Sequence, residues 1–81
     1  MTPADVTELI LTIIKPLVTE PDQVKVQVVS DSHFLNFNVT VAPADMGRVI
    51  GKNGRVVSSI RTIVYGVHLS QPARMRLNIV E

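Results

Sequence analysis

Two glycines, Gly51 and Gly54, bracket a lysine and an asparagine in the middle of this 81-residue chain. Glycine lets a backbone come close to a ligand, because no side chain stands in the way. Lys52 adds a positive charge at the tip of this segment, and Arg48 and Arg55 stand on either side of it. A helix that begins after such a turn also carries partial positive charge on its first amides. This combination of residues favours the binding of an anion, and phosphate is the anion we expect.

Apolar residues recur at helical spacing on both sides of the glycine segment. They are Val49 and Ile50 before it, and Val56, Val57, Ile60, Ile63 and Val64 after it. The spacing predicts a short helix over residues 44–50, with Asp45 near its start, and a second helix from about Arg55. Gly66 either ends the second helix or lies inside it. Because Val67 and Leu69 continue the apolar pattern, we expect the helix to run to about Leu69 and Pro72 to stop it.

Another helix is predicted near the beginning of the chain. Thr2 can cap this helix, Pro3 suits its first position, and Asp5 follows three residues after the cap. One apolar stripe then runs along it, formed by Val6, Leu9, Ile10, Ile13, Ile14 and Leu17. We expect this stripe to pack in the core.

Three segments alternate apolar and polar residues, as half-buried strands do. Their apolar positions are Val24, Val26 and Val28, then Leu35, Phe37, Val39 and Val41, and finally Met75, Leu77 and Ile79. The first two segments are close together in the sequence, which predicts an antiparallel hairpin. The second and third segments are joined through two helices, and such a crossover suits parallel neighbouring strands. The predicted order is α-β-β-α-α-β. This is an α+β fold in which helices cover one face of a three-stranded mixed sheet.

Length and composition restrict the possible functions. The 81 residues are 46% hydrophobic and predict a single domain over residues 1–81. Cysteine is absent, and no histidine or serine has the neighbours that a metal site or an activated nucleophile requires. We therefore expect neither a cofactor nor enzymatic activity. No apolar run is long enough for a membrane span and the start lacks a basic leader, so a cytoplasmic protein is expected.

The net charge of +1 conceals an uneven distribution of charge. Residues 1–45 carry −4, from two lysines and six acidic residues, whereas residues 46–81 carry +5, from six basic residues and Glu81. A nearly neutral protein with one basic end is suited to local phosphate contact rather than to broad electrostatic adhesion.

Other glycine-rich motifs do not fit the segment around Lys52. A P-loop has about four residues between its glycines and a Ser or Thr after its lysine. Here Gly47 and Gly51 enclose three residues, Asn53 follows the lysine, and the G-x-G of a dinucleotide site is missing. A helix–turn–helix in which the glycines serve only the geometry remains an open alternative.

The run from Val49 to Ile60, V-I-G-K-N-G-R-V-V-S-S-I, resembles the core motif of KH domains, an I-G-x-x-G followed by spaced aliphatic residues. The whole chain also resembles the small bacterial single-KH-domain RNA-binding proteins of the KhpA (YlqC) type, and its predicted order matches the type II KH fold. This resemblance implies that the turn clamps about four nucleotides of a single strand. The implied function is that of an RNA chaperone or post-transcriptional regulator.

The resemblance also implies which residues contact the RNA. They are Arg48, Val49, Gly51, Lys52, Asn53, Gly54, Arg55, Val57 and Ser58. Arg55 and Ser58 are the candidates for hydrogen bonds to bases, whereas Val49 and Val57 either support bases or belong to the ordinary core. The polar face of the sheet, formed by Lys25, Gln27, Asn36, Asn38, Thr40, Arg76 and Asn78, shows no stacking ring and is not expected to bind bases.

Single-stranded RNA is therefore the expected partner, and no membrane association is expected. The resemblance further implies a homodimer or a heteromer with a second KH-containing protein. A different class of function also remains open, in which the fold is a protein–protein interaction module and RNA binding is incidental.

Overall fold

Six main elements follow one another in the order that the sequence predicts. The computed structural model describes residues 1–70 and 73–80. Its helices are α1 (Pro3–Ile14), α2 (Met46–Ile50) and α3 (Arg55–Tyr65), and its strands are β1 (Lys25–Ser30), β2 (Phe34–Thr40) and β3 (Arg74–Val80). Short 3-10 turns at Lys15–Leu17, Pro21–Gln23, Pro43–Asp45 and Lys52–Gly54 join them.

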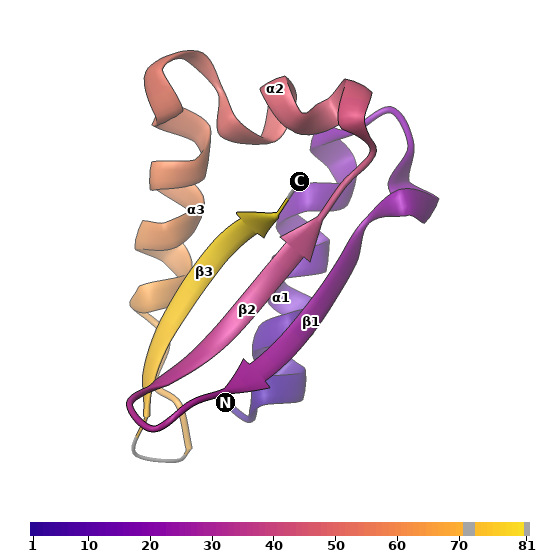
Figure 1. Cartoon of the computed structure of the whole chain (residues 1–81). Helices are drawn as coiled ribbons and strands as arrows, with labels where there is room; N and C mark the ends of the chain where they lie inside the picture. Colours follow the sequence, from indigo (N-terminus) through magenta and orange to yellow (C-terminus); the bar gives the residue numbers. More distant parts are fainter. Residues whose placement is uncertain (71–72, 81) are drawn as a thin grey trace.

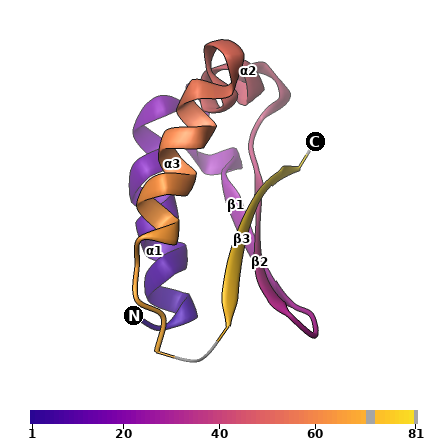
Figure 2. The same cartoon turned by 90° about the vertical axis from the view of Figure 1, so that its left-hand side faces the viewer.

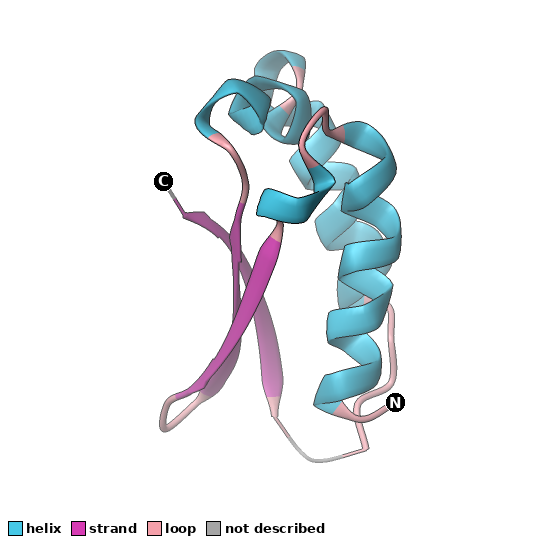
Figure 3. Ribbon diagram, turned by 90° about the vertical axis from the view of Figure 1, so that its right-hand side faces the viewer, coloured by secondary structure: helices cyan, strands magenta, loops and turns pink. Residues whose placement is uncertain are grey.

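The three strands form one mixed sheet with β2 in the centre. β1 pairs antiparallel with β2, with Val28 opposite Phe37, and β3 pairs parallel with β2, with Leu77 opposite Phe37. Both predicted pairings are confirmed. Figure 1 shows the strands side by side, with the β1–β2 hairpin at one end of the molecule and α2 at the other. Figure 2 and Figure 3 show that the long helices α1 and α3 lie together against one face of the sheet.

The core lies between this helical layer and the covered face of the sheet. Its completely buried apolar side chains are Val6, Ile10 and Ile14 of α1, Phe37 and Val39 of β2, Val49 of α2, Val64 of α3 and Leu77 of β3. β2 and β3 place alternate residues in this layer, because successive side chains of a strand point to opposite faces. β1 contributes only the half-buried Val26, whereas Val28, which the alternation predicts on the covered face, is 39% exposed. The predicted α+β fold is therefore confirmed.

The predicted cap of α1 is present. The Thr2 hydroxyl accepts a hydrogen bond from the Asp5 amide at 3.2 Å, and the Asp5 carboxylate accepts one from the Thr2 amide at 2.9 Å. The prediction that Leu17 belongs to the core stripe is wrong, since its side chain is 37% exposed. Lys15–Leu17 form a 3-10 turn, which has three residues per turn and so rotates Leu17 off the buried stripe.

The predicted extension of α3 to Leu69 is also wrong. The helix ends at Tyr65, and Gly66 closes its last turn by donating its amide to the carbonyl of Thr62 at 3.2 Å. Beyond Gly66 the chain turns toward the N-terminus, where the Ser70 amide donates to the Met1 carbonyl at 2.8 Å. Val67 and Leu69 pack against the core from this loop, which explains why the apolar pattern continues without a helix. Pro72 lies outside the described residues.

A buried carboxylate connects the loop before β1 to the start of α2. Asp45 accepts hydrogen bonds from the amide and hydroxyl of Thr19, at 2.9 and 2.8 Å, and from the amide of Glu20, at 3.1 Å. The sequence predicted Asp45 near the start of a helix, but its side chain makes no capping bond to α2. The hydrogen bond from the Thr19 amide, followed by those from the Thr19 hydroxyl and the Glu20 amide, holds the pKa of Asp45 below its usual value, against the effect of burial.

We expect Asp45→Asn to lower the melting temperature by several degrees, because the NH2 group that replaces Oδ2 cannot accept the bond from the Glu20 amide. The variant should also lose less stability in acid. A depressed carboxyl pKa stabilises the fold above the unfolded-state value of about 3.9, and this contribution is lost as the pH falls through the folded-state pKa. Thermal unfolding followed by circular dichroism between about pH 6 and pH 2 measures both effects.

Asp22→Asn, an exposed acid of the same connecting stretch, is the matched control. If the melting temperatures of the parent and of the Asp45→Asn variant fall equally steeply as the pH is lowered, the Asp45 carboxylate does not cause the loss of stability in acid.

Candidate nucleic-acid interface

The glycine turn between α2 and α3 consists of four residues, and three of them have positive φ angles. Gly51 has φ 77° and ψ 173°, Asn53 has φ 57° and ψ 27°, and Gly54 has φ 73° and ψ 14°. The turn is closed by the Gly51 amide, which donates to the Gly47 carbonyl at 2.9 Å, and by the Gly54 amide, which donates to the Gly51 carbonyl at 3.2 Å. Asn53 and Gly54 adopt the left-handed region, which asparagine and glycine enter more easily than other residues do.

Only glycine fits position 51 of this turn. Its φ and ψ fall in a region that is essentially restricted to glycine. In addition, a Cβ atom at this position would lie 2.3 Å from Cγ2 of Val56 and 2.8 Å from the Val56 amide nitrogen. Gly54 needs a positive φ but has open space around it, and Gly47 has neither restriction. The two glycines of the motif therefore act for different physical reasons.

The backbone amides of the turn lie just before the start of α3. Gly54 is the residue before this helix, and it has no side chain that could cap the helix. Among the residues that the structure describes, the amides of Lys52 and Asn53 have no backbone acceptor. Amides at such a position, together with the positive end of the helix dipole, can donate to an anion placed on the turn.

Three basic residues lie in or next to the turn that carries these amides. Lys52 and Arg55 are exposed, and within the described ranges neither forms an ion pair. The Nε of Arg48 lies 3.9 Å from Oδ1 of Asp45, but the Arg48 side chain remains 61% exposed. Because the Arg48 side chain is largely exposed and the distance to the buried Asp45 carboxylate is long, this contact is weak, so Arg48 can turn toward a ligand at small cost.

The remaining predicted site residues divide between surface and core. Ser58 is exposed on the first turns of α3, beside Arg55. Val49 is completely buried and Val57 is 8% exposed, so both pack in the core and present almost no surface to a base. Exposed apolar surface beside the turn comes instead from Ile50, which is 37% exposed, with the half-buried Val56 nearby. Helical spacing places all four apolar residues beside the turn in one pattern, but it does not show which of their side chains face outward. These residues are Val49, Ile50, Val56 and Val57.

The uncovered face of the sheet contains a ring that the sequence analysis did not identify. Phe34 lies on this face, at the start of β2, and the Arg76 guanidinium covers its ring at 3.9 Å from the centroid. Farther along the same face, the Asn78 side-chain amide donates to Asn38 at 3.0 Å, and that of Asn36 donates to Asp31 at 3.0 Å. The ring is thus covered by Arg76 and the side-chain amides are already hydrogen-bonded, which leaves these groups less available to a base.

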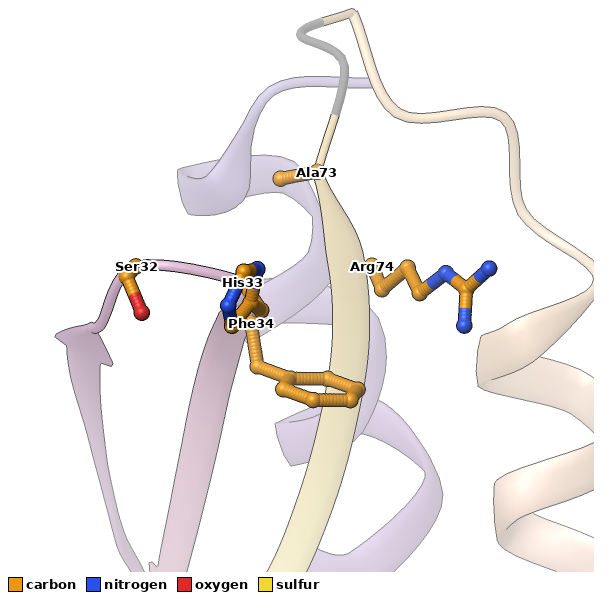
Figure 4. Close-up of a pocket in the computed structure, with 5 residues that line it drawn as sticks. All are labelled: Ser32, His33, Phe34, Ala73 and Arg74. Carbon is orange, nitrogen blue, oxygen red and sulfur yellow. The ribbon is translucent and has the colours of Figure 1, made fainter.

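A pocket of about 530 Å³ lies at the other end of the molecule, lined by Ser32, His33, Phe34, Ala73 and Arg74. Figure 4 shows that the side chain of Arg74 points away from the Phe34 ring, so the charged group and the ring do not converge on one ligand. The pocket borders the β1–β2 hairpin, whereas the glycine turn lies at the end of the molecule that carries α2 (Figure 1). The pocket is therefore not part of the candidate interface.

Two other classes of feature are absent from residues 1–70 and 73–80. No group of three or more acidic, histidine or cysteine side chains there could hold a metal ion. No helix in those ranges combines the length and the apolar character that crossing a membrane requires.

The element order, the mixed sheet and the positive-φ glycine turn together define a KH domain of type II. The family model described as "KhpA/KhpB, KH domain" matches residues 7–79. The chain belongs to this KhpA/KhpB family of KH domains.

Curated relatives support this membership over most of the chain. The "RNA-binding protein KhpA" of Lactiplantibacillus plantarum is 53% identical over 76 residues, which cover 94% of this chain and 89% of that protein. The proteins of the same name from Listeria monocytogenes and Streptococcus pneumoniae are 45% and 42% identical, over 91% and 76% of this chain and 97% and 78% of their own lengths. These relatives are named for RNA binding.

Alanine substitutions should separate the roles of the glycines. We expect Gly51→Ala to cost at least about 2 kcal/mol of unfolding free energy, from backbone strain and from the clash with Val56. Gly54→Ala should cost about 1–2 kcal/mol, because only the left-handed conformation is penalised. Gly47→Ala lies within a helix and should be neutral or stabilise by up to about 1 kcal/mol. Urea unfolding of the three variants measures this order, and equal stabilities for the Gly51 and Gly47 variants would contradict it.

Proposed function

We propose that this protein binds RNA and clamps a short single strand with its Gly51–Gly54 turn, acting in the cytoplasm as an RNA chaperone or post-transcriptional regulator. One observation carries the proposal: the turn combines a glycine-only backbone conformation with exposed basic side chains and available amides. Membership of a family whose curated relatives are named RNA-binding proteins supports it. The domain that carries the turn extends over residues 1–81 in this proposal.

The phosphate contact comes first in the proposed mechanism. A phosphate placed over the turn accepts hydrogen bonds from the amides of Lys52 and Asn53 and interacts with the positive end of α3. The ammonium group of Lys52 and the guanidinium groups of Arg48 and Arg55 neutralise the phosphate charge from three sides. The absence of side chains at Gly51 and Gly54 allows the RNA backbone to come close enough for these contacts.

Base contacts follow from what is exposed next to the turn. In this proposal Ile50 and Val56 supply the apolar surface against which a base packs, while Val49 and Val57 support that surface from the core. Arg55 and Ser58 are the proposed hydrogen-bonding groups for base edges. Only an unpaired strand can present its base edges in this way, and this is why single-stranded RNA is the proposed ligand.

The most direct variant changes the tip of the turn and keeps its glycines. Lys52→Asp combined with Asn53→Asp replaces one positive charge by two negative charges where the phosphate would lie. We expect affinity for a short single-stranded RNA to fall at least roughly tenfold, about 1.4 kcal/mol. The melting temperature should hardly change, because both side chains are exposed and aspartate tolerates the left-handed conformation of residue 53. Fluorescence anisotropy titration and thermal unfolding measure the two quantities.

A matched control separates local contact from overall charge. Lys25→Glu combined with Gln27→Glu makes the same change in net charge on exposed residues of β1, away from the turn. This control should bind as the parent does, and duplex RNA of equal length should bind the parent less well than the single strand. If the double-aspartate protein is folded and binds as tightly as the parent, the turn is not the phosphate clamp.

We also propose that the protein self-associates or pairs with a second KH-containing protein, since one such domain holds only about four nucleotides. Exposed apolar side chains support this, namely Val28 and Val29 on the outer strand β1 and Ile63 on α3, which are 39%, 41% and 51% exposed. The expected outcome for the protein alone is a mass above that of one 8.9 kDa chain in sedimentation equilibrium at high concentration. A strictly monomeric mass would leave only the mixed complex. A protein that assembles but binds no RNA would favour the interaction-module alternative.

A further inference from the structure

The outer edge of β3 is partly closed by two side chains of α3. β3 is the last strand of the sheet and pairs with β2 on one side only. On its other side, the Leu77 amide donates to the Tyr65 hydroxyl at 3.0 Å, and the Leu77 carbonyl accepts a hydrogen bond from Nε of Arg61 at 3.2 Å. Arg61 and Tyr65 are four residues apart and so share one face of α3. We call this arrangement the Leu77 latch.

The latch divides the edge of β3 into two parts. In an extended strand the backbone groups of alternate residues point to the same side, so those of Met75 and Ile79 point outward as those of Leu77 do. Neither of these two residues has an outward hydrogen-bond partner in the described part of the chain. Figure 1 shows α3 running alongside β3 in the opposite direction, with the C-terminal end of β3 toward the end of the molecule that carries α2. Ile79 therefore lies on the side of the latch nearer the glycine turn, and Met75 lies beyond it.

Charge favours this edge as the path of an RNA strand that leaves the turn. The positive residues of the second half of the chain lie on α2, the turn, α3 and β3, whereas residues 1–45 carry a net charge of −4. A free amide and carbonyl on a strand edge also offer a donor next to an acceptor, and the Watson–Crick edge of a base can pair with such a combination. At Leu77 the Tyr65 hydroxyl and the Arg61 guanidinium already occupy both groups.

We propose that the Leu77 latch sets the length of RNA that this domain holds. The inference rests on the proposed function of the glycine turn. A strand leaving the turn reaches the free backbone groups of Ile79 and stops at Leu77, where the latch occupies the edge. The footprint of this domain is therefore shorter than the roughly four nucleotides of a typical KH domain. Arg61 and Tyr65 are specificity-determining residues in this account, because they decide how many bases the edge can read.

A length series of RNA tests the proposal. Anisotropy titrations with uridine and adenosine oligonucleotides of about two to eight nucleotides give the length beyond which affinity stops rising. The parent should reach this plateau at a shorter length than Arg61→Ala combined with Tyr65→Ala, in which the edge at Leu77 is open. The plateau of the double variant should move by at least about one nucleotide. Lys25→Ala combined with Leu17→Ala is the control, since it removes one charge and one exposed apolar side chain and leaves the latch intact.

The outcomes distinguish a failure of the Leu77 latch proposal from a failure of the proposed RNA binding. Plateaus at the same length in the parent and the opened variant overturn the role of the latch and leave RNA binding in place. A parent that binds no oligonucleotide of any length overturns the proposed function and the latch with it.

If the variant with both Arg61→Ala and Tyr65→Ala does not fold, an NMR titration of the parent protein tests the proposal instead. Its amide signals can be followed by NMR during titration with an oligonucleotide of about four nucleotides. The signal of Ile79 should shift while that of Leu77 stays in place. A shift of Leu77 as large as that of Ile79 would show that RNA displaces the latch.

Discussion

The contact between Gly51 and Val56 is the constraint on which the candidate interface depends. The backbone of Gly51 passes so close to the first turn of α3 that a Cβ atom would lie 2.3 Å from Cγ2 of Val56. This close approach turns the chain sharply out of α2 and lets α3 begin only a few residues later. As a result, the amides and basic side chains of the turn stand at the end of a helix that is packed into the core. A looser turn would place the same residues in a mobile loop with no fixed geometry for a phosphate.

The rest of the fold holds the two helices that meet at this turn. α3 is anchored by Val57, Ile60 and Val64 in the core and by the bonds of Arg61 and Tyr65 to the edge of β3. The short helix α2 has only five residues and could not be stable alone. It is fixed by buried Val49 and by Asp45, whose carboxylate joins its start to the loop at Thr19 and Glu20. Burial of a carboxylate is costly unless it is fully hydrogen-bonded, and here three donors meet that requirement.

The sequence predicts most of the fold because its local signals agree with one another. The capping residues of α1, the alternation in the three strands and the two-helix crossover all indicate the same topology, and this topology is confirmed. Prediction fails where tertiary contacts replace local pattern. Val67 and Leu69 continue a helical pattern but pack on the core from a loop. The apolar stripe of α1 likewise does not show that the 3-10 turn at Lys15–Leu17 rotates Leu17 away from the core.

The candidate site can likewise be predicted only in part from local sequence signals. The glycines, Lys52 and the flanking arginines can be recognised from residue types and spacing alone. Which apolar residue faces a ligand cannot be, because Val49 and Ile50 are neighbours on one short helix and only the packing distinguishes the buried one from the exposed one. The Leu77 latch is equally invisible in the sequence. It joins side chains of α3 to backbone groups 12 and 16 residues away, and no local pattern marks such a bond.

The central claim is that the turn receives a phosphate of single-stranded RNA. A crystal structure of the protein with a short single-stranded RNA tests this claim most directly. We predict a phosphate oxygen about 2.7–3.2 Å from the amide nitrogen of Lys52 or Asn53, with the Lys52 ammonium group next to it. A complex in which the RNA lies on the uncovered sheet face, over Phe34 and the asparagines, while the turn remains empty would contradict the account.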